Sequence, residues 1–359
     1  MSTVASNIPV SALCGSSWRW DQTIPIMTFN FENLQTSQDT LAFWVAAPGR
    51  GEIRSEPIPA PDSLTLSVQT LYSGVSRGTE ALVFGGHVPP SEYERMRAPF
   101  QVGQFPAPVK YGYSNVGRVV EGPPDLVGKI GFCLYPHQQR YVVPREAFYV
   151  LPESVPAQRA VLAANLESAL NGLWDSGAAP GDRVSVVGAG SVGCLAAWLA
   201  SRIPGCDVEL IDVNSQRASV ARALGLKFAQ PVAARVGADV ILHSSGAAEG
   251  LALAMRIAGF EATIVELSWY GMRSVTLPLG ESFHSQRLTL KSSQVGAVAG
   301  ARRARWNFRR RMELVLTLLT DPALDALINS EGAFEDLPQT LCKLSKSAGD
   351  VIMHRVTYD

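Results

Sequence analysis

The sequence predicts an α/β protein in which a doubly wound parallel sheet accompanies a second, β-rich domain. Its 359 residues, 47% of them hydrophobic, exceed what one compact core usually holds, which favours two domains. Short alternating strands interrupted by Pro and Gly fill residues 40–150. Strand and helix patterns then alternate from about residue 182 to 300, and this βαβ rhythm requires a parallel sheet.

The first residues, 1–38, are rich in Ser, Thr, Asn and Gln, and we expect them to form a disordered extension. They have neither a basic start nor a long apolar core, so no signal peptide is expected. No apolar run reaches the roughly 18 residues of a transmembrane helix, so no membrane partner is expected. We assign residues 39–170 and 299–359 to the β-rich domain and residues 171–298 to the parallel-sheet domain.

The expected elements follow this division. The β-rich domain should contain strands at 41–46, 64–71, 115–121, 129–134 and 139–143. A helical segment then ends at Gly177 and Pro180. The alternating region should contain strands at 183–187, 207–211, 238–242 and 262–267, with helices at 191–202, 215–224 and 247–258. A helix at 303–320 and strand-like segments at 292–298 and 350–359 complete the chain.

The strongest motif is a glycine turn between an apolar strand and a helix. Gly188, Gly190 and Gly193 form G-x-G-x-x-G, in which they permit a tight turn, approach of a pyrophosphate, and close packing of helix on strand. Ser191 and Val192 begin the helix, whose free N–H groups attract phosphate. The pattern predicts a dinucleotide site, although a glycine turn in another kind of α/β protein remains an alternative.

An acidic residue ends the next predicted strand. Asp212 lies 19 residues after Gly193, where a carboxylate can bind both hydroxyls of a ribose and repel a 2′-phosphate. Arg217 could lie over the adenine ribose, but it could also bind a 2′-phosphate. We therefore expect NAD as the cofactor, with NADP as the alternative.

Charge and cysteine content narrow the class of protein. The net charge is −1, from 31 basic and 32 acidic residues, which argues against nucleic acid or an anionic membrane as a partner. The five cysteines include no C-x-x-C pair, so we expect neither a disulfide framework nor a structural zinc site. A reducing cytoplasm is the simplest setting.

Four stretches resemble the medium-chain dehydrogenase/reductase superfamily, which includes the zinc-type alcohol dehydrogenases. They are GAGSVG, SGVSRGTE, VKYGYSNVGRVVEG and AANLESALNGLW. The resemblance implies a Rossmann domain with a GroES-like catalytic domain and a homodimer. The SGVSRGTE stretch and the loop at 88–90 are similar to those of bacteriochlorophyllide dehydrogenase-like proteins, a zinc-ligand-depleted subgroup.

The same resemblance indicates which residues stand where zinc members have ligands. Ser76 matches the cysteine, Tyr113 the histidine, and Glu167 the third ligand on the helix before the Rossmann domain. Hydroxyls are poor zinc ligands beside thiolate and imidazole, so we expect an enzyme that works without zinc.

Without a metal, hydrogen-bond donors must stabilise the developing oxyanion. Tyr113 is the first candidate for acid–base work, with Ser76 and Thr79 as further donors. Arg77 could add positive charge, and Glu80 and Glu167 could orient their neighbours. A structural Glu80–Arg77 pair, and a Tyr113 that only fills the space of the metal, are equally open.

Two further segments contain candidate contact residues. His284 and Arg287 could contact cofactor or substrate, or they could be exposed loop residues. Six arginines lie within residues 302–311, at the start of the predicted helix at 303–320. They could recognise an anionic substrate, a partner or nucleic acid, but a solvated helix face with its apolar residues inward is favoured. The inward residues would be Trp306, Met312, Leu316 and Leu319.

These observations together predict an NAD(P)-dependent, zinc-independent oxidoreductase. It would move a hydride between nicotinamide and a small-molecule carbonyl, alcohol or activated alkene. Two alternatives stay open: a nucleotide-binding sensor or scaffold without turnover, and a degenerate zinc enzyme in which Glu167 and water hold a metal.

Overall fold

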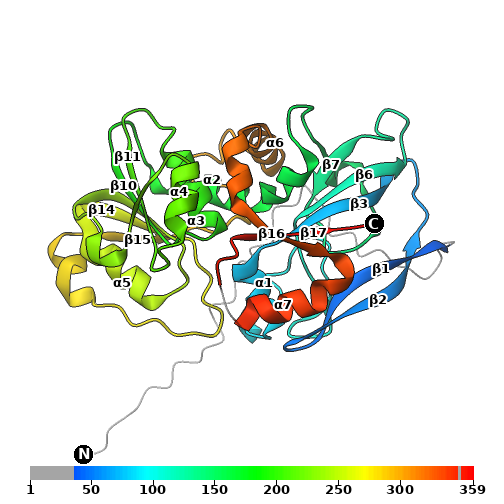
Figure 1. Cartoon of the computed structure of the whole chain (residues 1–359), viewed down its shortest axis with the longest axis horizontal. Helices are drawn as coiled ribbons and strands as arrows, with labels where there is room; N and C mark the ends of the chain where they lie inside the picture. The colour runs from blue at the N-terminus through cyan, green and yellow to red at the C-terminus, as the bar shows by residue number, and fades with distance from the viewer. Residues whose placement is uncertain (1–35, 347–348) are drawn as a thin grey trace, which may run out of the picture.

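The computed structural model of the chain describes residues 36–346 and 349–359. The first strand begins at Thr36, inside the segment predicted as an extension, and residues 1–35 lie outside the described part. Figure 1 shows the parallel sheet on one side of the molecule and the β-rich part on the other, with α2 (Ala163–Ser176) and α6 (Phe308–Leu318) between them. The predicted α/β fold class is confirmed.

A six-stranded sheet, parallel throughout, forms the first part. Its strand order is β12-β11-β10-β13-β14-β15, which places the topological switch point between β10 and β13. The bounds are β10 Arg183–Val187, β11 Asp207–Ile211, β12 Lys227–Ala229, β13 Ala238–His243, β14 Ala258–Glu266 and β15 Thr289–Ser292.

Helices cover both faces of this sheet, so its central strands are buried on both sides. In β10, Val184 and Val186 join a core with α2 and α3 (Ser191–Ala200), whereas Val187 joins another core with α5 (Ala248–Ile257). This burial on two faces explains the continuous apolar runs of the strands. Helix α4 (Arg217–Ala223) adds Ala221 to the first core.

The β-rich part consists of two further sheets. A four-stranded sheet has the order β2-β1-β5-β4, with bounds Arg50–Pro59, Thr36–Ala47, Val109–Lys110 and Val102–Gly103. A seven-stranded sheet has the order β16-β17-β3-β6-β7-β9, and β8 (Arg140–Pro144) also pairs with β3. The bounds are β16 Ile328–Ala333, β17 Met353–Thr357, β3 Thr65–Val75, β6 Asn115–Glu121, β7 Ile130–Cys133 and β9 Tyr149–Val150.

The end of the chain returns to the β-rich part. Strand β17 runs antiparallel to β3, with His354 opposite Val75 and Thr357 opposite Tyr72. Helix α7 (Leu337–Lys346) buries Leu337, Leu341 and Leu344 in the core that also holds Val75, so an i, i+4, i+7 stripe fixes it there. Helix α1 (Arg77–Phe84) follows directly after β3.

Two predictions for the last third of the chain were wrong in detail. Helix α6 begins at Phe308 rather than 303, because the Asn307 side chain accepts a hydrogen bond from the Arg310 amide and caps the helix there. Residues 293–298 form no strand; the strand is β15, which ends at Ser292. The inward stripe on α6 is confirmed for Met312, Leu316 and Leu319, whereas Trp306 is half-buried.

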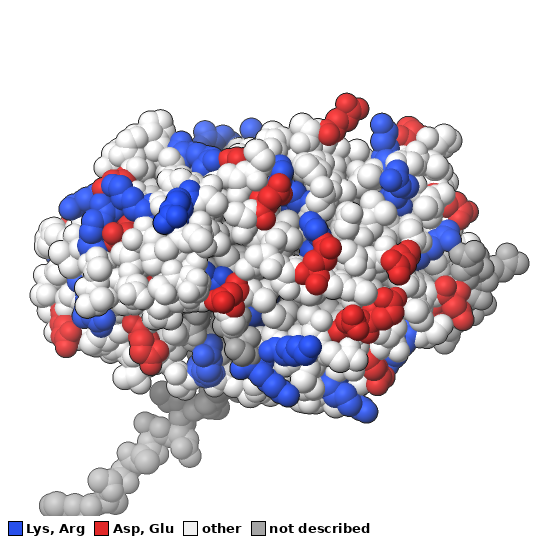
Figure 2. Space-filling view, in the orientation of Figure 1, with Lys and Arg blue, Asp and Glu red and all other residues white. Residues whose placement is uncertain are grey.

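The surface matches the balanced composition. Figure 2 shows acidic and basic side chains interspersed over the face displayed. Among the described residues, we find no helix with the length and apolar character needed to cross a membrane.

Candidate functional site

A cluster of hydroxyl groups lies where β3 passes into α1. Ser76 is the N-cap residue of α1, and Tyr113 lies two residues before β6, the neighbour of β3. Burial raises the pKa of Tyr113 to about 12, and the hydroxyls of Ser76 and Thr79 interact with its phenol and oppose that rise. The structure therefore brings these three predicted residues together.

Glu80 fixes the Ser76 end of this cluster. Its Oε1 accepts a hydrogen bond from the Ser76 amide at 2.7 Å, and its Oε2 is hydrogen-bonded to Nε2 of His137 at 2.8 Å. Both side chains are buried, so each supplies the partner that the other needs. Glu80 thus contacts Ser76, and it pairs with His137 rather than with Arg77.

No sequence pattern pointed to the contacts of His137. Its Nδ1 is hydrogen-bonded to the Ser73 hydroxyl at 2.7 Å, and that hydroxyl is 2.8 Å from the Tyr358 hydroxyl. The residues of this buried chain come from β3, the loop before β8 and the C-terminus. Because Glu80 and His137 are 57 residues apart, no local spacing could have identified the pair.

The glycine turn has the geometry predicted for it at two of its glycines. Gly188 has φ of +108°, and a Cβ there would lie 2.6 Å from the Ser245 amide nitrogen. A Cβ at Gly193 would lie 1.8 Å from the Gly188 carbonyl oxygen. These two positions accept only glycine, since the turn and the first turn of α3 touch there.

The middle glycine faces open space. A Cβ on Gly190 would meet no atom within 4 Å, and the next residues, Ser191, Val192 and Gly193, present the first N–H groups of α3. On the inner side, the Asn165 amide donates to the Ser191 hydroxyl at 2.8 Å, while its Oδ1 is buried without a partner among the described residues. A dinucleotide pyrophosphate fits this arrangement of open backbone and unpaired N–H groups.

Asp212 lies directly over the turn. One carboxylate oxygen accepts a hydrogen bond from the Ala189 amide at 2.6 Å, and the other accepts one from the Asn214 amide at 2.8 Å. Each oxygen keeps further lone pairs for ligand hydroxyls. The position therefore fits a ribose-binding carboxylate.

Arg217 binds backbone carbonyls near the C-terminal strand β17 and has no contact with the glycine turn among the hydrogen bonds of the described residues. It is 6% exposed, and its Nη1 donates to the Asp350 carbonyl at 2.6 Å, so its guanidinium holds the segment before β17. The geometry does not favour a 2′-phosphate at this side chain, because the donors already have backbone partners.

Arg77 connects the two halves of the site. Burial lowers the pKa of Arg77, as does the positive charge of Arg217, while Asp212 acts in the opposite direction. Arg77 follows Ser76 in the chain, and its charge interacts with that of Asp212 at the glycine turn. The loop after β14 adds a second junction, where the Met272 amide donates to the His87 carbonyl at 3.2 Å.

Glu167 is held by an arginine from the C-terminal third. Arg311 Nε donates to Glu167 Oε1 at 3.0 Å, and Nη1 of the same guanidinium donates to Asn171 at 2.7 Å. Burial raises the pKa of Glu167, while the charge and hydrogen bond of Arg311 oppose that rise. Among the described residues, no hydrogen bond joins Glu167 to Tyr113, Ser76 or Thr79.

One member of the arginine run is therefore an exception to the predicted solvated face. Arg311 is 1% exposed, although Arg303, Arg305, Arg309 and Arg310 are exposed as expected. It lies next to the apolar stripe of α6, where a guanidinium needs the buried carboxylate of Glu167 as its partner.

His284 and Arg287 lie apart from the other candidates. Arg287 forms an exposed ion pair of 2.7 Å with Glu261, near the amino end of β14, whereas the glycine turn is at the carboxyl edge of the sheet. His284 is exposed in the same connection. The structure thus does not bring these two residues to the site.

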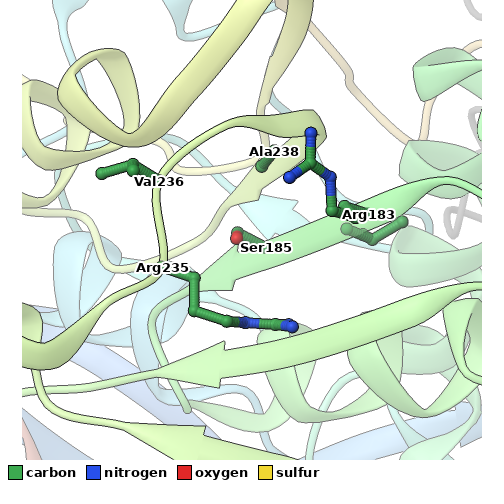
Figure 3. A pocket seen from close by; sticks show the side chains of 6 residues that line it. Arg183, Ser185, Arg235, Val236 and Ala238 are labelled. Atoms are coloured by element: carbon green, nitrogen blue, oxygen red, sulfur yellow. The ribbon is translucent and has the colours of Figure 1, made fainter.

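A small pocket lies at the opposite edge of the parallel sheet. Its volume is about 80 Å³, and Figure 3 shows Arg183 and Arg235 at its sides. Arg235 is engaged by Asp207 and by Glu209 at 3.1 Å. Because the pocket is at the amino end of β10, it is separate from the glycine turn.

Whether the site could bind a metal ion depends on which side chains are available as ligands. Residues 36–346 and 349–359 contain no group of three or more His, Cys, Asp and Glu residues arranged to hold a metal ion. At the positions that resemble zinc ligands, two side chains are hydroxyls and the third, Glu167, is bound by Arg311.

Comparison with known proteins identifies the fold. The chain superposes on a putative zinc-binding dehydrogenase from Sinorhizobium meliloti 1021 bound to NADP, with a TM-score of 0.72 and 18% identity over 89% of this chain and 100% of that chain. It superposes equally well on L-idonate 5-dehydrogenase from Escherichia coli, with a TM-score of 0.72 and 14% identity over 89% of this chain and 98% of that chain. The chain has the medium-chain dehydrogenase/reductase fold.

Sequence comparison agrees with this medium-chain dehydrogenase/reductase fold. D-guloside 3-dehydrogenase of Escherichia coli K12 is 27% identical over 204 residues, which are 53% of this chain and 58% of that protein. The chain thus spans little more than half the length of this curated relative. No family model matches the chain.

The glycines provide a paired test of the dinucleotide site. Gly193→Ala should unfold at a lower temperature, because its Cβ would overlap the Gly188 carbonyl, with a loss of about 1–3 kcal/mol. Gly190→Val should keep the wild-type unfolding temperature but lose NADH binding, since its side chain would occupy the space above the turn. Thermal unfolding and calorimetric titration measure both; a Gly190→Val protein that binds NADH normally would contradict the site.

The buried ion pair can be tested separately. Arg311→Leu should lower the free energy of unfolding by about 3–5 kcal/mol, because Glu167 would keep a buried charge without a partner. Adding Glu167→Gln should restore part of the loss. Arg303→Leu, at an exposed position, is the control and should change stability by less than about 0.5 kcal/mol in denaturant unfolding.

Proposed function

We propose that this chain is an NAD-dependent oxidoreductase that transfers a hydride between nicotinamide and a carbonyl or secondary-alcohol substrate. The observation that supports this best is the position of Arg77, which follows Ser76 of the hydroxyl cluster and interacts with Asp212 of the glycine turn. A dinucleotide lying along the turn would therefore end near groups able to stabilise an oxyanion. An activated alkene is the less favoured substrate type.

The residues of the turn would bind the cofactor, and the cofactor would supply hydride chemistry. The open face of Gly190 and the first amides of α3 would receive the pyrophosphate, and Asp212 would accept hydrogen bonds from the adenine ribose. A carboxylate at this point repels a 2′-phosphate, and Arg217 is occupied by backbone carbonyls. Both features favour NAD over NADP.

Tyr113 would donate a hydrogen bond to the substrate oxygen. With a pKa raised to about 12, its phenol keeps its proton at neutral pH and acts as a donor rather than as a base. Ser76, held by Glu80, and Thr79 would supply further hydroxyls around the same oxygen. Glu167 would stabilise α2 and α6 through Arg311 rather than contact the substrate.

This chemistry would proceed without zinc. Hydroxyl oxygens bind zinc weakly compared with thiolate and imidazole, and the Glu167 carboxylate is already paired. Metal analysis of protein purified without chelator should find less than stoichiometric zinc. One zinc per chain that is required for turnover would contradict this part of the proposal and support a degenerate zinc enzyme.

The names of the relatives indicate which substrates to test first. D-guloside 3-dehydrogenase and L-idonate 5-dehydrogenase are named for sugar-type substrates, so polyhydroxylated alcohols and their ketones form the first panel to test. A homodimer would pair the edge strand β15, which has all four residues exposed and one partner strand within the described chain. The four described cysteines are free, which agrees with a reducing compartment such as the cytoplasm.

Cofactor titration is the primary test. NADH should bind with a Kd in the micromolar range and at least about tenfold more tightly than NADPH, because Asp212 opposes a 2′-phosphate. Calorimetry with both nucleotides measures this directly. Absence of binding of either at millimolar concentration would remove the proposed function, and binding without turnover on the substrate panel would favour a nucleotide sensor.

The role of Tyr113 has a matched control. Tyr113→Phe should lower kcat by roughly 100-fold without changing the Kd for NADH, because it removes a hydrogen bond that strengthens in the transition state. Tyr111→Phe, whose ring lies 5.9 Å from that of Tyr113, should change kcat little. A wild-type kcat in Tyr113→Phe would exclude the donor role.

The pH profile gives a second readout for the same residue. Since its pKa is raised to about 12, Tyr113 should remain protonated while the pH passes through 10, the ordinary pKa of tyrosine. The contribution of Tyr113 to kcat should therefore persist from about pH 7 to 10. A loss of that contribution centred near pH 10 would show that its phenol titrates as if exposed.

A further inference from the structure

A hydrogen-bonded chain of three side chains lies at the carboxyl edge of the parallel sheet. His243 ends β13, and Glu266 ends the neighbouring strand β14. The His243 Nε2 is 2.6 Å from the Ser245 hydroxyl, and its Nδ1 is 2.7 Å from Glu266 Oε2. His243 is fully buried, whereas Ser245 is exposed, so the chain runs from the interior to the surface.

Glu266 and Ser245, the two partners of His243, determine which ring nitrogen of His243 donates a hydrogen bond. A carboxylate can only accept, so the His243 ring donates from Nδ1 to Glu266, and in the neutral ring Nε2 then accepts the Ser245 proton. The Tyr270 hydroxyl and the Ser268 amide also donate to Glu266, at 3.0 and 2.7 Å, and fix its orientation. Ser245 therefore presents its oxygen outward as an acceptor, with one lone pair used by the Ala247 amide at 3.2 Å.

The position of Ser245 relates this acceptor to the glycine turn. The Ser245 backbone packs so closely on Gly188 that a Cβ there would lie 2.7 Å from the Ser245 Cα. Strand β10, which precedes the turn, has β11 with Asp212 on one side and β13 with Ser245 on the other. The two residues thus flank the turn at the switch point of the sheet.

A dinucleotide that crosses this turn has two ribose rings, one on each side of the pyrophosphate. If its adenine ribose lies at Asp212, its second ribose lies on the β13 side. The loop after Glu266 leads from there to the hydroxyl-cluster part, because Trp269 packs against the core that contains Val75. Ser245 is therefore on the side of the turn from which the nicotinamide would reach Tyr113.

We propose that Ser245, held by His243 and Glu266, binds a hydroxyl group of the ribose in the nicotinamide half of the cofactor. The inference rests on the proposed function and assigns this binding to side chains outside the glycine motif. His243 and Glu266 are positioning residues that keep the Ser245 oxygen free to accept.

The same three residue types form hydrolase triads, but the surroundings favour binding. A triad needs free N–H groups for an oxyanion near the serine. Here the Gly246 amide donates to Ser268 at 3.0 Å and the Ala247 amide donates to Ser245 itself. The two backbone amides that follow Ser245 are therefore already used.

The test compares ligands with and without the second ribose. NADH and ADP-ribose contain it, and ADP does not. Ser245→Ala in the full chain should weaken NADH and ADP-ribose by roughly tenfold, the usual effect of one hydrogen bond, while ADP binding stays within about twofold of wild type. Ser285→Ala changes an exposed serine whose hydroxyl donates to the Glu281 carbonyl; it is the control and should change none of the three affinities.

The outcomes are distinguishable. Wild-type NADH affinity in Ser245→Ala would overturn the inference but leave the proposed function intact. Equal weakening of ADP and NADH would also overturn it, because Ser245 would then act only by shaping the turn. Failure of wild-type protein to bind any of these nucleotides would overturn the proposed function and the inference together.

The positioning role has a spectroscopic readout. In ¹⁵N-labelled protein, His243 should be the neutral tautomer protonated at Nδ1, and Glu266→Gln should move the proton to Nε2, since an amide can donate to the ring. That variant should also lose part of its NADH affinity with ADP binding unchanged. A wild-type His243 protonated at Nε2 would contradict the proton arrangement from which the inference follows.

Discussion

The contact between Gly193 and the carbonyl of Gly188 is the constraint on which the candidate site depends. No side chain fits between them, and this closeness lets α3 begin immediately above the end of β10. The helix amides, Asp212 on one side and Ser245 on the other then meet around a single bend of backbone. A wider turn would separate these groups, and the neighbouring strands could not compensate, because their spacing is fixed by the sheet.

In the β-rich part, buried acidic side chains hold the candidate site residues in place. Two of the three residues at positions that resemble metal ligands are hydroxyls here, and the buried acids Glu80 and Glu167 are each hydrogen-bonded to a base that is distant in the sequence. Glu80 has His137, and Glu167 has Arg311. Such pairs are expensive to bury but orient their neighbours strictly, and in this protein the neighbour of Glu80 is the serine beside Tyr113.

The sequence predicted what depends on local pattern. The glycine motif, the acid after the next strand and the alternation of strand and helix are contained in short segments, and the parallel sheet and the turn are found where expected. Ser76, Thr79 and Tyr113 lie together in the structure, and the sequence grouped them through the family resemblance rather than through their spacing. Short strands such as β4, β5 and β9 were missed, because two residues give no periodicity.

The remaining features depend on contacts across long sequence distances. Arg311 looks like its exposed neighbours in the arginine run, and its partner Glu167 is 144 residues away. His243 and Glu266 end adjacent strands, but they are 23 residues apart in the sequence and belong to no motif. Arg217 was predicted near a ribose, and its actual partners, in the segment before β17, could be known only once the chain end was placed.

The insertion of β17 beside β3 has a consequence for biosynthesis. Residues 353–357 pair with 72–75, immediately before Ser76, and Tyr358 completes the buried chain through Ser73 and His137. A nascent chain can build the glycine turn while it is still attached to the ribosome. The strand beside the hydroxyl cluster can pair only after residues 353–357 have left the ribosome, so the half with the glycine turn can fold before the β-rich half is complete.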